Sequence, residues 1–103
     1  MASVILINPF EVPEGQEEAF LAGWRAAAEH LRHAEGFIST RLHKSLDPAT
    51  KFQFINVAEW ASPQHFEAAM RSRAFRQVRG ELPKLDFVAY PALYEVLVEE
   101  QPT

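Results

Sequence analysis

Cysteine is absent from this chain of 103 residues, and its absence excludes three kinds of chemistry. Without thiols the protein has no disulfide, no thiolate nucleophile and no cysteine-ligated zinc. A chain without cysteine is also typical of a reducing compartment. We therefore expect a cytoplasmic protein.

Long apolar runs and concentrated positive charge are missing as well. The apolar run at residues 4–7 is too short for a signal peptide, and no run approaches the length of a membrane span. The formal net charge is −4, and the arginines near residues 71–79 are scattered rather than clustered. Because binding to phosphates needs a positive face, we expect neither a nucleic-acid nor a membrane partner.

Several catalytic motifs are also lacking. The chain contains no glycine-rich phosphate loop, no nucleophile elbow and no His-Glu-x-x-His helix. What remains is a globular composition, 48% apolar and 23% charged. The length predicts a single domain over residues 1–103.

Residues 52–60 are the most informative part of the chain, because aromatic and β-branched residues predict a strand there. Side chains alternate along a strand, so Asn56 lies in an apolar row; that row contains Phe52, Phe54, Ala58 and Trp60. Two interpretations are open. Either the polar atoms of Asn56 and Trp60 are satisfied within the core, or both point into an apolar small-molecule pocket.

The remaining pattern predicts strands at residues 3–10, 37–45 and 93–99, a helix at 14–33, and a helix at 63–80 with a break near Ser72. Residues 82–91 are expected to form a loop. The order β-α-β-β-α-β predicts an α+β, ferredoxin-like fold with a four-stranded antiparallel sheet and both helices on one face. Since the strands are apolar on both sides, we expect the bare face to pair in a homodimer.

The four histidines and Arg79 each admit two interpretations. His30 and His33 lie three residues apart, where they can bind a metal or interact with the helix C-terminus. No third ligand accompanies them, so no metal site is expected. His43 belongs either to a solvent-facing row or to a polar pocket wall, and His65 is either a neutral base in the first turn of a helix or an exposed side chain. Arg79 is either solvated or available to an anionic ligand.

Motifs along most of the chain resemble the antibiotic biosynthesis monooxygenase family. They are Ile7-Asn8-Pro9-Phe10, Val12-Pro13-Glu14-Gly15, Trp24, Glu35-Gly36-Phe37, Leu46-Asp47, Asn56-Val57-Ala58-Glu59-Trp60 and Phe66. The resemblance implies a dimeric α+β barrel and oxidation of an aromatic (anthrone- or hydroquinone-like) or enolic small-molecule substrate by O₂, with no metal, flavin or haem. It implies catalytic roles for Asn56, Trp60 and Arg79. The residues it implies as substrate-binding are Asn8, Trp24, Phe54, His65 and Phe66.

Two departures from known relatives bear on the alternative functions. Phe66 stands where such oxygenases carry a tyrosine, so a non-catalytic small-molecule-binding module is one alternative, and a carbonyl isomerase is another. Haem-degrading relatives share the equivalents of Asn8 and Trp60. Their haem-ligating histidine lies near the position of Arg79, and arginine cannot serve as the neutral axial ligand, so no haem is expected.

Overall fold

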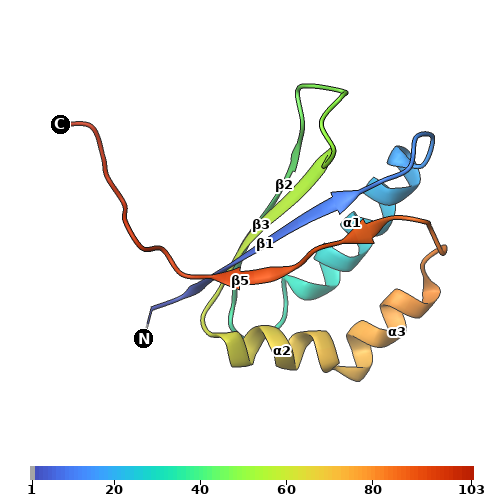
Figure 1. Cartoon of the computed structure of the whole chain (residues 1–103). Coiled ribbons are helices and arrows are strands. Elements are labelled where there is room, and N and C mark those ends of the chain that lie inside the picture. The colour runs from blue at the N-terminus through green and yellow to red at the C-terminus, as the bar shows by residue number, and fades with distance from the viewer. Residues whose placement is uncertain (1) are drawn as a thin grey trace.

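The computed structural model describes residues 2–103. Its elements, in chain order, are β1 (Val4–Glu11), α1 (Glu17–Leu31), β2 (Phe37–Lys44), β3 (Phe54–Trp60), α2 (Pro63–Arg71), α3 (Arg73–Glu81), β4 (Val88–Ala89) and β5 (Ala92–Tyr94). The strands form one antiparallel sheet in the order β2-β3-β1-β4, with β5 also paired to β1 (Figure 1). This is the ferredoxin-like α+β fold that the sequence predicts. Because β1 has neighbours on both sides, it is an interior strand.

The C-terminal edge of the sheet differs from the prediction. In place of a loop over residues 82–91 and a strand over 93–99, two short strands pair with β1. Pro91 separates them, since it has no N–H to donate to the ladder. The predicted strand beyond Tyr94 is wrong, because the chain leaves β1 there; the side chains of Val96, Leu97 and Val98 are 64%, 88% and 74% exposed. Figure 1 shows this segment running away from the domain.

Glycine and serine residues mark the helix ends. Gly15 and Gly36 have φ angles of +91° and +86°, which a residue with a side chain rarely adopts. Gly15 therefore delays α1, which is shorter than the predicted helix at 14–33. Ser62 accepts a hydrogen bond from the N–H of His65 and caps α2. Ser72 is extended, with ψ 145°, and caps α3, which confirms the predicted break.

A bulge between Phe37 and Ser39 changes the faces of β2. Strict alternation places Phe37 and Thr40 on opposite faces of the sheet. In the structure Phe37 pairs with Trp60 and Thr40 with Ala58, and the extra residue between them brings both onto the helix side. His43 stays exposed, its Nδ1 lying 3.3 Å from the carbonyl oxygen of Ile55.

The core is divided into two buried clusters. One contains Leu6, Ala58, Trp60 and Ala69, and the other contains Phe10, Phe20 and Phe54. Between them, on paired positions of β1 and β3, lie Asn8 and Asn56. The register thus places two amides side by side where a continuous core would have apolar residues.

Candidate small-molecule site

A cavity of about 910 Å³ lies between the sheet and the three helices. The sheet side of this cavity is formed by Leu6, Asn8 and Phe10 of β1 and by Asn56, Ala58 and Trp60 of β3. Four of these residues belong to the two core clusters, and the other two are the paired asparagines. The volume is at the upper end of the range found for small-molecule pockets, and the lining is mostly apolar with a few polar groups.

The cavity exists partly because α1 presents small side chains to it. Ala19, Gly23 and Ala27, spaced four residues apart and therefore on one face of the helix, all line the cavity. A Cβ added at Gly23 would lie 3.9 Å from Leu82 Cδ1, an ordinary contact. Glycine is therefore not required there by space or by a positive φ, and its effect is to leave room in the cavity.

The side chain of Asn56 is held by one hydrogen bond through its oxygen, and its NH₂ group is available to bind a ligand. Its side chain is 8% exposed, and Thr40 Oγ1 donates to Asn56 Oδ1 over 2.6 Å. Within residues 2–103, Asn56 Nδ2 has no hydrogen-bond acceptor. Thr40 thus fixes the orientation of the amide and leaves an N–H donor at the cavity wall.

Two further polar atoms at this cavity are buried without a hydrogen-bond partner among the described residues. They are the Nε1 of Trp60 and the Oδ1 of Asn8. Trp60 is 1% exposed, and its ring meets those of Phe37 and Phe66 edge-on at 5.4 and 5.7 Å. An unsatisfied buried polar group costs about 1–3 kcal/mol, and such groups are rare in native proteins. Asn8 and Trp60 both line the cavity, although these two atoms themselves have almost no accessible surface.

Six of the eight predicted site residues line this cavity, and two do not. Those that line it are Asn8, Trp24, Asn56, Trp60, Phe66 and Arg79. Phe54 lies in the second core cluster, with its ring 5.0 Å from that of Phe20. His65 borders a separate, smaller cavity. Phe54 and His65 therefore lie outside the lining of this cavity.

Contacts with Ser62, Glu35 and Gly36 fix the position of His65. Ser62 Oγ lies 2.7 Å from His65 Nδ1, and His65 Nε2 lies 3.8 Å from a carboxylate oxygen of Glu35. In the tautomer that fits both contacts, the serine hydroxyl donates to Nδ1 and the Nε2–H points to the carboxylate. A Cβ on Gly36 would come within 2.3 Å of the ring, so this glycine makes room for His65. Packing and capping therefore account for the position of His65.

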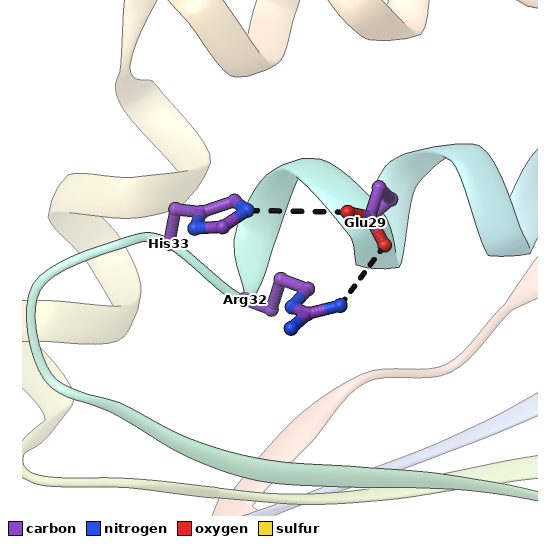
Figure 2. A network of polar contacts seen from close by, with 3 residues as sticks. All are labelled: Glu29, Arg32 and His33. Carbon is purple, nitrogen blue, oxygen red and sulfur yellow. Dashed lines mark hydrogen bonds and ion pairs between the residues drawn. The ribbon is translucent and has the colours of Figure 1, made fainter.

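The histidine pair at the end of α1 is divided between two environments. His33 Nε2 lies 3.9 Å from one carboxylate oxygen of Glu29, and Arg32 binds the other at 3.3 Å (Figure 2). His30 instead stacks against Phe75, with ring centroids 6.2 Å apart. In the part of the chain that the structure describes, no group of three His, Asp or Glu side chains is arranged to hold a metal ion.

Sequence reasoning missed three residues of the site. Thr40 orients Asn56, and Arg76 and Lys84 line the cavity beside Arg79. Arg76 precedes Arg79 by three residues, a helical spacing that places the two on one face and was available from the sequence. Lys84 follows α3 in a segment without periodicity, so no sequence signal places it.

A ferredoxin-like domain with a large, mostly apolar cavity and a few polar groups is typical of proteins that bind small molecules. A family model for antibiotic biosynthesis monooxygenase matches residues 3–81. The chain therefore belongs to the antibiotic biosynthesis monooxygenase family.

Solved structures agree with this assignment. A protein from Shewanella loihica that is provisionally assigned as a monooxygenase is 39% identical, with 95% of this chain and 97% of that chain covered and a TM-score of 0.82. SnoaB from Streptomyces nogalater, a cofactor-independent oxygenase, is 19% identical, with 96% and 97% covered and a TM-score of 0.80. A variant of MhuD, solved with two manganese protoporphyrin IX molecules per active site, is 21% identical, with 96% and 99% covered and a TM-score of 0.76. No curated protein sequence matches the chain.

None of the helices within residues 2–103 combines the length and the apolar character needed to cross a membrane.

Proposed function

We propose that this protein is a cofactor-independent monooxygenase that oxidises an electron-rich aromatic or enolic small molecule with O₂. The observation that carries the proposal is that Trp60 and Asn8, which line a mostly apolar cavity, each hold a buried polar atom without a partner among the described residues, Trp60 Nε1 and Asn8 Oδ1. Together with Asn56 Nδ2 they offer two donors and one acceptor to a ligand. Membership of the family and the structural likeness to a cofactor-independent oxygenase support the same reaction class.

The proposed chemistry requires an anion to be stabilised in a largely apolar site. The substrate loses a proton to become a carbanion or phenolate, which transfers one electron to O₂, and the two radicals combine to a peroxide. For an anthrone, the ring methylene becomes a carbonyl that keeps one oxygen atom, and the other leaves as water. Trp60 Nε1 and Asn56 Nδ2 are donors of the type that stabilises the substrate oxyanion, and Arg79 adds positive charge at the cavity.

The cavity lining offers no ordinary general base. Among the described residues that line it there is no aspartate, glutamate, histidine or tyrosine. We therefore assign the role of proton acceptor to water. In this mechanism the protein lowers the pKa of the bound substrate through its hydrogen-bond donors and does not itself take the proton.

The residues that line the cavity also argue against two alternative functions. A carbonyl isomerase needs a side chain that moves a proton, so the lining disfavours it. A haem-degrading activity needs an axial ligand; Met70 lines the cavity, but no histidine does, and the residues present do not fit histidine-ligated haem. A non-catalytic binding module remains the second candidate, because Phe66 lacks the tyrosine hydroxyl and the described lining holds no carboxylate, imidazole or phenol to move a proton.

The deciding experiment is O₂ uptake by metal-stripped protein with anthrones, naphthols and hydroquinones. We expect saturable uptake that is insensitive to chelator and is lowered on the order of 10²-fold or more in the Asn56→Ala/Trp60→Phe variant. Arg73→Gln, exposed on α3 and outside the cavity lining, is the control, and circular dichroism verifies that all variants fold. Full activity in the double variant would overturn the proposed site. Saturable quenching of tryptophan fluorescence without O₂ uptake would identify a binding module.

We also propose that two copies of the domain pair through the sheet face opposite the cavity. Ile5, Ile7, Ile55 and Val57 alternate with the cavity-facing residues of β1 and β3 and therefore lie on that face. Sedimentation equilibrium should give a dimer at micromolar concentration, and Ile7→Glu/Val57→Glu should give a folded monomer. A wild-type monomer at all concentrations would contradict this arrangement. The cytoplasmic location and the absence of a nucleic-acid partner stay predictions.

A further inference from the structure

Positive charge is concentrated at one end of the cavity. Arg76 and Arg79 of α3 and Lys84 of the following segment line it, and no acidic residue does. Residues 71–84 hold five of the ten Lys and Arg residues of the chain and a single acid, Glu81. The formal net charge of the whole chain is −4, so this local surplus is opposite in sign to that of the protein.

These three cations also lack carboxylate partners among the described residues. The ion pairs present there join Arg32, His33, Lys51 and His65 to glutamates, and none involves Arg76, Arg79 or Lys84. Arg79 lies with its guanidinium carbon 5.8 Å from the centroid of the Phe75 ring. A guanidinium in such a contact keeps its planar edge of N–H donors available for a carboxylate.

The opposite wall of the cavity has a different character. The sheet supplies neutral hydrogen-bonding atoms, namely Trp60 Nε1, Asn8 Oδ1 and the amide of Asn56. The cavity is therefore asymmetric, with neutral polar groups on the sheet and unpaired cations on α3 and the segment after it. A ligand that satisfies both walls needs neutral oxygens on its ring system and a permanent negative charge at its periphery.

We propose that the substrate of this site is an amphipathic anion, an aromatic or enolic ring system that carries a carboxylate held by Arg76 and Lys84. This inference rests on the proposed function, since it names the substrate class of the same cavity. The carboxylate lies at the α3 end, and the ring oxygens lie against the sheet. Arg79 lines the same cavity and adds to its positive charge.

A matched pair of stable ligands tests the charge requirement without turnover. Anthraquinone-2-carboxylate and anthraquinone-2-carboxamide have nearly the same shape and differ in charge. The two tryptophans of the chain, Trp24 and Trp60, both line the cavity, so quenching of their fluorescence reports occupancy. We expect the carboxylate to bind about tenfold more tightly than the amide, as a charged hydrogen bond predicts.

Two variants with the same change in charge identify which cations are responsible. Arg76→Gln/Lys84→Gln should bring the two affinities within about twofold of each other. Arg71→Gln/Arg73→Gln, exposed and outside the cavity lining, should keep the preference for the carboxylate. Raising the ionic strength from about 0.01 M to about 1 M shortens the Debye length from about 30 to about 3 Å and should reduce the preference in the wild type.

The result that overturns this inference is equal affinity of the wild type for the two ligands, no binding of the carboxylate, or an equal loss of preference in both double variants. O₂ uptake with unsubstituted anthrone and with anthrone-2-carboxylate, measured separately on the wild type, tests the proposed function. Uptake without a charge preference would refute the anionic substrate and keep the oxygenase. A charge preference without uptake would refute the oxygenase and keep the anionic ligand.

Discussion

The two asparagines that face each other across β1 and β3 should respond in opposite directions to the same substitution. Asn8 and Asn56 occupy paired positions in the register. Asn8 Oδ1 is buried without a partner, whereas Asn56 Oδ1 accepts the 2.6 Å hydrogen bond from Thr40. Leucine keeps the γ-branched shape of asparagine but is larger, and both positions line the cavity, which leaves room for the added volume.

At position 8 the substitution removes an unsatisfied acceptor and joins the two core clusters. An unsatisfied buried group costs about 1–3 kcal/mol, so we expect Asn8→Leu to raise the free energy of unfolding by about 1–2 kcal/mol. For a domain of this size each kcal/mol corresponds to roughly 4–8 °C in Tm. The same change should weaken ligand binding, because it removes an acceptor at the cavity wall.

At position 56 leucine leaves the Thr40 hydroxyl without its acceptor. We expect Asn56→Leu to lower the free energy of unfolding by about 1 kcal/mol, so that the two variants differ by about 2 kcal/mol or more. Urea unfolding followed by circular dichroism measures both, and an unchanged m-value verifies that the transitions are comparable. If both variants lose stability by similar amounts, the claim that Asn8 is an unsatisfied group in the ligand-free protein is wrong.

Three further predictions follow from single contacts. Thr40→Val removes the donor to Asn56 with little change in shape, and should lower the free energy of unfolding by about 1 kcal/mol and reduce O₂ uptake; an unaltered rate would show that Asn56 needs no orienting group. Ser62→Ala removes the α2 cap and should cost about 1–2 kcal/mol in urea unfolding while leaving ligand affinity unchanged. Gly23→Ala should stabilise α1 by up to about 1 kcal/mol, whereas Gly23→Phe should block ligand binding measured by fluorescence quenching.

The sequence was sufficient for the central strands and for the most buried part of the site. The period of two along β3 places Phe54, Asn56, Ala58 and Trp60 on one face, and these four residues are buried in the structure. A strand with one buried face has a fixed register, so its polar exceptions can be identified from spacing alone. The spacing therefore places Asn56 and Trp60 on one face of β3, whereas the side that the helices cover is known only from the structure.

Other parts of the site depend on geometry that spacing does not encode. Alternation fails at the β2 bulge, where one extra residue moves Phe37 to the helix side. A first-turn position does not specify which side of α2 a residue faces, so His65 could not be assigned to a cavity. Lys84 reaches the cavity because of the path of the chain after α3, where Asp86 N donates to Gln16 Oε1 at 3.1 Å and joins that segment to the start of α1.

The solvent exposure of each polar group determines how its removal should change turnover. Trp60 is 1% exposed, so its N–H is shielded from bulk solvent, and a donor of this kind to a developing oxyanion is worth on the order of 10²–10³ in rate. Arg79 is exposed and its charge is screened by solvent. We therefore expect Trp60→Phe to lower kcat on the order of 10²-fold with little change in KM.

Arg79→Gln should have the opposite signature, with KM for an anionic substrate raised several-fold and kcat changed much less. Steady-state O₂ uptake across a range of substrate concentrations separates the two effects, and Arg73→Gln, on the same helix but outside the cavity lining, is the control. An Arg79→Gln variant whose kcat falls as far as that of Trp60→Phe would mean that the cation reaches the reacting atoms. The α3 wall would then have to close over the substrate, since only exclusion of water could give an exposed guanidinium that effect.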